Sequence, residues 1–250
     1  MPSSARRLRA ALGYATVAVL LTTAVLAVIA ALRSEDDPDR QVTPETEQAL
    51  LVEDFEAHRA GQRWVDGRQY GQWRADYDGF GTTRVIENGG RRLSMSPTIA
   101  RSPKITHASL VTTVEEFEDI DLNAELRTVR QLRPRAANPW EVAWLLWHYT
   151  DDNHFYSVVL KPNGWELGKE DPEYPGSQRY LATGDRPSFP LGVQHKIRVR
   201  HTKNSITVWA NGKLLTRYTD KERPYFKGSV GLYTEDAEVE FDNVVVRSPQ

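Results

Sequence analysis

The sequence contains no cysteine among its 250 residues, and this absence removes several classes of protein. Without thiols there is no disulfide scaffold, no CxxC redox centre, no thiolate zinc site and no cysteine nucleophile. The sequence also lacks a large excess of charge of either sign, since the formal net charge is −2 at pH 7. That balance excludes a uniformly basic nucleic-acid-binding protein, although a local basic groove remains compatible with it.

Acidic and aromatic residues are scarce in the N-terminal part of the chain. Residues 1–34 include four arginines and no Asp or Glu. Of the seven Trp, ten Tyr and seven Phe residues, only Tyr14 precedes Phe55. The composition therefore indicates one aromatic, mildly acidic domain that follows a basic, apolar leader.

The leader contains an uncharged run that is long enough to cross a membrane. Residues 10–32 form 23 consecutive positions without a charge, which span roughly 34 Å as a helix. The backbone must pair internally in lipid, so we expect one transmembrane helix there. Arginines precede this run and acidic residues follow it, which places residues 1–9 in the cytoplasm as a short basic tail. Residues 33–49 are polar and acidic and are expected to form a flexible stalk.

A cleaved signal peptide is the alternative interpretation of the leader. The tripeptide Val28-Ile29-Ala30 offers small residues for cleavage, but the run is longer than the usual hydrophobic region of about 7–15 residues. Both interpretations export the rest of the chain. We therefore expect a single-pass protein of the cell membrane whose C-terminal domain is extracytoplasmic.

Residues 50–248 have the pattern of an all-β domain. Short β-rich runs alternate with Gly, Pro, Asn and Asp clusters, and no amphipathic helix of useful length is present. The dipeptides Asn163-Gly164 and Asn211-Gly212 each separate two such runs, and Asn-Gly suits a two-residue hairpin turn. The length and strand number favour one large antiparallel sandwich of two sheets.

Strand parity predicts an open face that combines polar and aromatic side chains. In the runs 121–132, 140–149 and 155–161 we expect odd-numbered side chains to lie on an open face, although a β-bulge would reverse this parity. Sugar binding needs flat apolar surfaces beside fixed polar groups, while Trp140 and Trp144 are expected in the core. The expected binding residues are Arg127, Gln131, Glu141, Trp147, Tyr149 and Lys161. For Trp147, packing in the core is an equally weighted alternative.

A catalytic constellation is also conceivable within this set. A lyase needs an Arg or Gln to neutralise a uronate carboxylate, and a Tyr or His to transfer the proton. His148, Tyr149 and Arg127 are the candidates for these roles. The alternative is that His148 makes structural hydrogen bonds, as histidines in strands commonly do.

Three segments carry a resemblance to a known family. VEDFE at 52–56, LLWHYTDDNHFYSVVL at 145–160 and GSVGLYTEDAEVEFDNVVV at 228–246 resemble concanavalin A-like lectin/glucanase domains. More narrowly, the chain is similar to LamG-type and 3-keto-disaccharide hydrolase (family-16-like) jelly rolls. The resemblance implies two antiparallel sheets with sugars lying across a concave face. It also implies a structural Ca²⁺ where the first and last strands meet, with Asp54 and Asp242 as ligands. The alternative is that these carboxylates take part only in turns or edge hydrogen bonds.

One motif of the resembled glucanases is missing. Their strand with E-x-D-x-E or E-x-D-x-x-E spacing carries paired catalytic carboxylates. The nearest acid-rich strings here, Glu115–Asp121 and Glu166–Glu173, have the wrong spacing or run into a turn. The usual glucanase chemistry, which needs two carboxyl groups about 5–5.5 Å apart, is therefore not expected.

The sequence as a whole predicts a membrane-anchored, extracytoplasmic carbohydrate-binding jelly roll. Its expected partners are a cell-envelope polysaccharide or another carbohydrate, and the membrane through residues 10–32; no nucleic acid is expected. The alternative is a glycan-cleaving enzyme on the same face, either a polysaccharide lyase or a glycoside hydrolase-like protein. A purely structural or protein-binding module is the third possibility.

Overall fold

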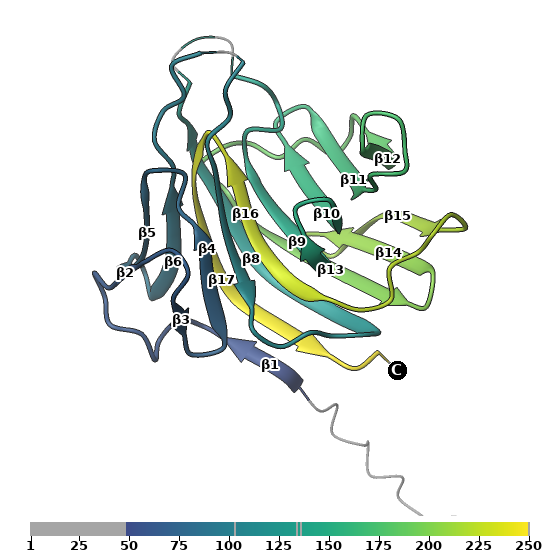
Figure 1. Cartoon of the computed structure of the whole chain (residues 1–250), viewed down its shortest axis with the longest axis horizontal. Coiled ribbons are helices and arrows are strands. Elements are labelled where there is room, and N and C mark those ends of the chain that lie inside the picture. The colour runs from purple at the N-terminus through teal and green to yellow at the C-terminus, as the bar shows by residue number, and fades with distance from the viewer. Residues whose placement is uncertain (1–48, 103, 134, 136, 250) are drawn as a thin grey trace, which may run out of the picture. The chain divides into compact units, whose positions relative to one another are not determined.

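Alternation of apolar and polar residues along the chain forms strands, and the strands assemble into two sheets. The computed structural model describes residues 49–102, 104–133, 135 and 137–249, and this part of the chain contains strands but no helix. All strand pairs within it are antiparallel. The two sheets pack against each other, and β1 lies at the same end of the domain as the C-terminus (Figure 1). The expected all-β, two-sheet sandwich is confirmed.

Sheet A carries the first and last strands of the described chain. Its strands are, in spatial order, β15 (Lys213–Thr219), β14 (Ser205–Ala210), β13 (Gln194–Thr202), β8 (Ile120–Gln131), β17 (Ala237–Arg247), β6 (Arg91–Ser96), β5 (Thr82–Glu87) and β2 (Arg63–Trp64). The first strand, β1 (Ala49–Glu53), pairs with β17 outside this order.

Sheet B carries the middle of the chain. Its spatial order is β12 (Gln178–Gly184), β11 (Gly164–Glu170), β10 (His154–Lys161), β9 (Ala143–Asp151), β16 (Ser229–Glu235), β7 (Ala108–Thr113), β4 (Trp73–Tyr77) and β3 (Gln69–Tyr70). Adjacent strands β8 and β9 of the sequence therefore belong to different sheets.

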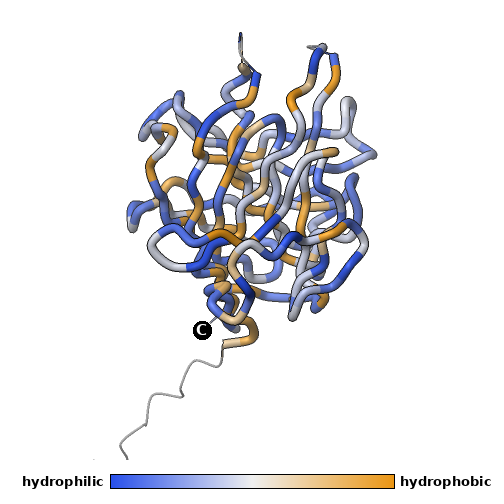
Figure 2. Tube along the Cα trace, turned by 90° about the vertical axis from the view of Figure 1, so that its left-hand side faces the viewer, coloured by the Kyte–Doolittle hydropathy of each residue, from blue (hydrophilic) through white to orange (hydrophobic). Residues whose placement is uncertain are grey.

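The core lies between the two sheets. On β8 the even-numbered residues Leu122, Ala124 and Leu126 are buried, as the alternation predicts. Trp147 and Tyr156 from sheet B are fully buried against them. Figure 2 shows the corresponding alternation of hydrophobic and hydrophilic positions along the strands. Burial of these apolar side chains, at roughly 25 cal/mol per Å², is the main force that holds the sheets together.

A second apolar cluster covers the outer face of sheet B, on the side opposite the core. It consists of Leu110, Val142, Trp144, Leu146, Phe155 and Val159, with Tyr77, Tyr149 and Tyr233 packed against it. An open sheet face in an antiparallel sandwich is usually polar. The outer face of sheet B departs from this pattern, since its apolar residues are buried beneath neighbouring side chains.

In strand β9, the residues that face outward change from even-numbered to odd-numbered at His148. Trp144 and Leu146 belong to the outer cluster, and Tyr149 joins it after His148, which has a φ of 49°. The pairing of β9 with β16 shifts register there, between Ser229 and Gly231. This bulge inserts one residue, so even-numbered side chains face out before His148 and odd-numbered ones after it.

The two predicted hairpins are present. Asn211 and Gly212 have φ values of 49° and 76° and join β14 to β15, which is the expected Asn-Gly turn. Between β10 and β11, Lys161 pairs with Gly164, so the turn residues are Pro162 and Asn163. That turn lies one position earlier than expected.

The leader lies outside the described residues. The expected transmembrane helix at residues 10–32, the tail at 1–9 and the stalk at 33–49 (except for its last residue, Ala49) fall in the part of the chain before β1. Among the described residues, no helix has the length and hydropathy needed to span a membrane.

Candidate functional site

The main cleft of the domain lies over the outer face of sheet B. Its volume is about 420 Å³, within the range of about 300–1,000 Å³ that is typical of small-molecule sites. Strands from the whole middle of the sheet contribute to it. The lining residues are Tyr77, Leu110, Trp140, Trp144, Leu146, Tyr149, Asp152, Phe155, Glu166, Glu170, Gln178, Tyr180, Tyr233 and Glu235.

The floor of the cleft is aromatic. The rings of Trp144 and Tyr233 meet edge to face at 5.5 Å, and the Trp144 Nε1–H donates to the backbone oxygen of Trp140 at 2.7 Å. This hydrogen bond fixes the indole in one orientation. Trp140 and Tyr180 are exposed, so aromatic surface reaches from the floor to the rim.

Carboxylates stand beside these rings. The hydroxyl groups of Tyr77 and Tyr149 both donate to Asp152 Oδ1, at 3.1 and 2.9 Å. Tyr233 likewise donates to Glu235 Oε1 at 2.8 Å. Burial raises the pKa values of Tyr77 and Tyr149, and Asp152 raises them further, so both phenols remain protonated donors.

Glu170 is the side chain in the cleft whose charge is most sensitive to pH. Burial raises the pKa of Glu170 to about 7, and the nearby carboxyl of Glu235 adds to the effect. Burial also raises the pKa of Glu235, against the hydrogen bond from Tyr233 that lowers it. Burial in the cleft therefore favours the neutral form of both carboxyl groups.

Strand β11 brings Glu166 and Glu170 to the same face because they are four residues apart. Gly168 lies between them, and a Cβ atom there would come within 2.9 Å of Ser157 Oγ. Because Gly168 has no side chain, no side-chain atom of this residue stands between the two glutamates on the floor of the cleft. Glu166 is neutralised by an ion pair with Lys161.

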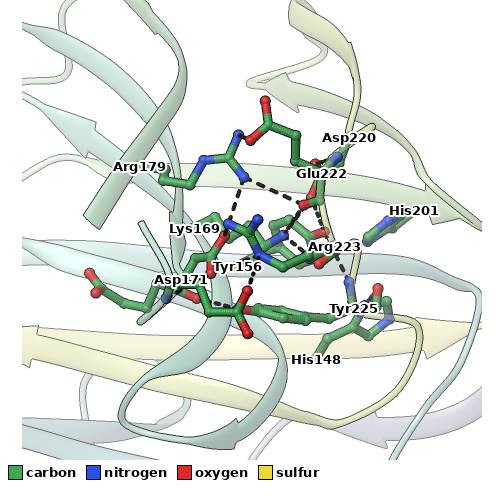
Figure 3. Close-up of polar contacts among 12 residues, drawn as sticks. His148, Tyr156, Lys169, Asp171, Arg179, His201, Asp220, Glu222, Arg223 and Tyr225 are labelled. Atoms are coloured by element: carbon green, nitrogen blue, oxygen red, sulfur yellow. Dashed lines mark hydrogen bonds and ion pairs between the residues drawn. The ribbon is translucent and has the colours of Figure 1, made fainter. Parts of the chain in front are cut away.

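The opposite face of β11 is anchored by a buried network (Figure 3). Lys169 is fully buried and donates to Asp220 Oδ2 at 2.8 Å, while the Tyr156 hydroxyl donates to the same carboxylate oxygen at 2.6 Å. Lys169 also donates to the backbone oxygens of Glu222 and Arg223. The segment that follows β15 is thereby fixed against β11, directly beneath the cleft.

The segment after β15 also contacts the backbone of β11. The Tyr225 hydroxyl donates to the backbone oxygen of Glu170 at 2.8 Å, and its ring lies 4.4 Å from Lys169 Nζ. At the end of β11, Asp171 accepts from Arg223 and Arg179. Glu170 is consequently presented to the cleft by a backbone with little freedom to move.

Two of the expected binding residues lie on the cleft side of sheet B. Tyr149 lines the cleft. Lys161 is buried and reaches the cleft wall through its ion pair with Glu166.

Trp147 does not lie on the open face, and the core-packing alternative is the one that the structure shows. Its side chain is fully buried between the sheets, where its Nε1–H donates to His201 Nδ1 at 3.0 Å. Trp144, which was expected in the core between the sheets, lines the cleft instead. The reason is the bulge at His148, which separates the parity of Tyr149 from that of Trp147.

Arg127, Gln131 and Glu141 lie away from the cleft lining. Arg127 is on β8 of sheet A, where it pairs with Glu240 at 2.7 Å. Gln131 donates to the backbone oxygen of Asn138 at 2.7 Å. Glu141 is 1% exposed and pairs with Arg133 at 2.8 Å. The expectation that three runs share one polar face is therefore wrong, because the run 121–132 belongs to the other sheet.

The candidate catalytic trio is not assembled either. His148 is buried, and its ring nitrogens lie 2.9 and 2.7 Å from the backbone oxygens of Tyr225 and Glu118. Burial lowers its pKa. These contacts correspond to the structural alternative for His148, and Arg127 lies on the other sheet.

The junction of the first and last strands forms as the resemblance implied. Strand β1 pairs with β17, with Glu53 opposite Val244, and Asp54 is near enough to Asp242 to raise its pKa, although burial is the larger cause. Arg92 Nη2 lies 3.7 Å from Asp242 Oδ2. Among the described residues, no group of three or more His, Asp or Glu side chains could hold a metal ion.

This donor set fits calcium poorly, because the ion prefers six to eight oxygens. Arg92 already supplies positive charge to Asp242. A Ca²⁺ ion between Asp54 and Asp242 stays a prediction, and it would require the Arg92 guanidinium to move.

Sequence reasoning missed Trp144, Glu166, Glu170 and Glu235 as cleft residues. A usable signal was present for β11, since Glu166 and Glu170 share one face of any strand that contains both. The string Glu166–Glu173 does not match the glucanase motif, because it lacks a central acid and runs into a turn. No local signal identifies Glu235, because its proximity to Glu170 depends on the sheet order.

The fold and the cleft define the class of protein. Two antiparallel sheets with a cleft on one outer face, together with the family match, make this domain a glucanase-like jelly roll of the concanavalin A-like type. Residues 61–247 match the model of the 3-keto-alpha-glucoside-1,2-lyase-like domain, so the chain belongs to that family. No curated protein matches the chain in sequence.

Solved structures share the fold at low sequence identity. A carbohydrate-binding module, CBM66, from Bacillus subtilis has a TM-score of 0.53 at 12% identity, covering 74% of this chain and 99% of its own. A non-specific endo-beta-1,3(4)-glucanase from family GH16 has a TM-score of 0.54 at 12% identity, covering 81% and 91%. The Bacillus licheniformis beta-glucanase has a TM-score of 0.53 at 12% identity, covering 82% and 100%. At this identity the similarity shows the fold alone.

Proposed function

We propose that the cleft over sheet B binds a carbohydrate. The observation that carries this proposal is the aromatic floor of Trp144 and Tyr233 beside the carboxyl groups of Asp152, Glu170 and Glu235. Sugar rings present flat C–H surfaces that pack on aromatic faces, and hydroxyl groups that hydrogen-bond to carboxylates. A deep, orientated indole next to fixed acceptors meets both needs.

The similar structures give this proposal independent support. One is named as a carbohydrate-binding module and two as glucanases, and the family of this chain is described by a glucoside. All of these names concern sugars, while some denote binding and others cleavage. Fold similarity therefore favours a carbohydrate ligand without choosing between the two activities.

The acidic lining of the cleft indicates whether the bound sugar is charged or neutral. None of the described side chains that line it belongs to Arg, Lys or His, and Lys161 at its edge is paired with Glu166. A uronate or sulfated glycan would meet like charge without a neutralising partner. We therefore propose an uncharged glycan as the ligand, which argues against the polysaccharide lyase alternative.

Glycan binding is tested by titrating the purified full-length protein with a panel of neutral and anionic polysaccharides. We expect neutral members to raise the melting temperature, and Trp144→Ala to remove that shift. Tyr218→Ala, at a partly buried aromatic away from the cleft, is the control. Preferential stabilisation by uronate polymers would contradict the proposed ligand class.

A second candidate function is cleavage of the bound glycan, and the raised pKa values favour it. A protonated Glu170 can donate its proton to the leaving glycosidic oxygen as the C–O bond breaks. An ionised Glu235 can accept a proton from the attacking water as the new C–O bond forms. The proton lost by water then resides on Glu235, so the step is balanced.

Cleavage is tested by following the release of new reducing or unsaturated ends from any glycan that binds. If Glu170 is the acid, Glu170→Gln loses release by at least a hundredfold while binding is retained. If the wild-type protein binds glycans without releasing ends, the domain is a binding module.

We further propose that the leader anchors the domain outside the cytoplasm. Support comes from the sequence, namely the 23 uncharged residues at 10–32, the preceding arginines and the following acidic residues. Protease added to intact cells should degrade the C-terminal domain while the protein fractionates with membranes. A mature protein that begins after Ala30 would instead establish the cleaved signal peptide.

A further inference from the structure

A second cavity opens next to the cleft, and the proposed function does not account for it. Its volume is about 350 Å³. Its wall is formed by the turn after β4, by the residues that lead into and begin β7, and by the turn between β2 and β3. The first two segments supply Phe80, His107 and Ala108, and the third supplies Asp66. Phe80 is 86% exposed, the largest exposed fraction among the large apolar side chains of the described residues.

The backbone holds Phe80 in its exposed position. Phe80 itself has a φ of 60°, which is rare for a non-glycine residue. Gly79 precedes it with a φ of 63°, and a Cβ atom there would lie 2.5 Å from the backbone oxygen of Ala108. A Cβ atom on Gly81 would collide with the backbone at Ser96. The glycines let this turn lie flat against its neighbours, and a positive φ at an exposed Phe marks a position that costs stability.

His107 packs against the Phe80 ring and offers one ring nitrogen, Nε2, as a hydrogen-bond acceptor. The two rings meet edge to face at 5.4 Å. His107 Nδ1 lies 2.6 Å from the backbone oxygen of Thr98, so Nδ1 carries the proton that it donates. In the neutral imidazole, Nε2 is then an acceptor. Phe80, His107 and Asp66 together combine an apolar ring with two hydrogen-bonding groups.

The second cavity adjoins the cleft at Tyr77. Tyr77 lines both of them. On β7, Leu110 lines the cleft and Ala108 lines the second cavity, and these residues are two positions apart on one face of the strand. A chain-like ligand that lies on the outer face of sheet B can therefore pass over Tyr77 from one cavity into the other.

We propose that the second cavity holds a further sugar unit of a glycan whose other end occupies the cleft, with the sugar packed on Phe80. The inference rests on the proposed function and deepens it, because it makes the ligand an oligosaccharide or polysaccharide rather than a single sugar. Apolar ring surface with adjacent carboxylate and imidazole acceptors matches a hydroxylated ring better than a purely apolar group, which would leave Asp66 and His107 without use.

The test compares glycans of increasing length. The probes are ladders of neutral gluco-, xylo-, manno- and galacto-oligosaccharides from two to eight units, titrated against the full-length protein. We expect affinity to rise with length in any ladder that binds, and Phe80→Ala to weaken the long members roughly threefold to tenfold while leaving the shortest unchanged. Trp144→Ala should weaken every member.

Phe226→Ala provides the matched control, since Phe226 is also exposed and lines neither cavity. The inference is overturned if Phe80→Ala leaves the length dependence intact, if it weakens short and long members equally, or if Phe226→Ala has the same effect. In each of these cases glycan binding at the cleft stands. If the wild-type protein binds no member of any ladder, the proposed function fails and the inference fails with it.

Discussion

Glu170 is a residue whose ionisation is coupled to the stability of the whole domain. Its folded-state pKa of about 7 lies above its usual value of 4.5. The folded protein therefore binds more protons than the unfolded chain between these values, and stability falls as the pH rises through that window. Because Gln mimics the protonated acid, we expect Glu170→Gln to be more stable than the wild type at pH 8, by about 1 kcal/mol after allowance for solvent screening.

Urea denaturation at pH 8 and at pH 4.5 measures this effect, and the gain should disappear at the lower pH. Glu116→Gln, at an exposed glutamate, is the control and should show no such pH dependence. A gain of the same size at both pH values would indicate a change in packing rather than the loss of a charge.

Trp144 and Trp147 lie on opposite faces of one strand and are expected to respond differently to substitution. Trp147→Phe removes the donor to the buried His201 Nδ1, so we expect about 1–3 kcal/mol lower stability with little change in glycan affinity. Trp144→Phe should weaken glycan binding, because the phenyl ring is smaller and cannot donate to Trp140. Chemical denaturation and glycan titration of both variants separate the two roles.

The sequence predicts that side chains alternate between the two faces of a strand, but it does not predict which residues of each strand face the core. Even-numbered residues of β8 are buried as expected. In β9 the same rule fails at His148, because a bulge with a positive φ at a non-glycine residue has no clear local signal. Strand parity alone therefore places Trp147 on the open face in place of Trp144. It places Tyr149, which follows the bulge, correctly.

At the scale of elements, β11 depends on its contact with the segment after β15. Lys169 and Asp220 are both fully buried and lie 2.8 Å apart. Removing one partner leaves an uncompensated buried charge, so we expect Lys169→Met to lower stability by about 3–5 kcal/mol. The double variant Lys169→Met/Asp220→Asn should lose less than the sum of the two single variants.

Chemical denaturation of the four proteins in this cycle gives the coupling between the two side chains. Additive losses would mean that the pair does not act as a unit. Arg130→Met, which breaks a surface ion pair with Glu238, provides the comparison and should cost less than 1 kcal/mol.

The assignment of strands to sheets could not be read from the sequence. Runs 121–132 and 140–149 are neighbours in the chain, and a short connection usually joins adjacent strands. Here β8 and β9 lie in different sheets, so Arg127 could not share a face with Tyr149. The hairpin of β14 and β15 was predictable because its turn residues are local.

At the scale of the whole molecule, acid should destabilise the fold through buried histidines. Burial lowers the pKa of His201 to about 3, and burial lowers that of His148 as well. The unfolded chain takes up these protons near pH 6.5, so stability is present above that pH and is lost as the pH falls towards 3. For His201 alone we expect a loss of order 3 kcal/mol by pH 4.

Melting temperature as a function of pH measures this loss, and His201→Gln should flatten the acid limb. The direction is opposite to that of Glu170, so wild-type stability should peak near pH 6–7. A melting temperature that stays constant between pH 7 and pH 4 would contradict the prediction.

The architecture as a whole was the most predictable level. Turn residues, short β-rich runs and the closing segment predict the antiparallel sandwich, and the resemblance implied that its first and last strands meet. The cleft was less predictable, because it is assembled from seven strands and two turns whose order only the folded chain reveals.

The pairing of β1 with β17 has a mechanical consequence. The chain enters the domain at Ala49, and the ladder bonds that join β1 to β17 run across the strand direction. Tension applied along β1 loads these bonds together in shear, whereas a sideways pull breaks them one after another. The domain should therefore resist a force that is aligned with its first strand better than a force from the side.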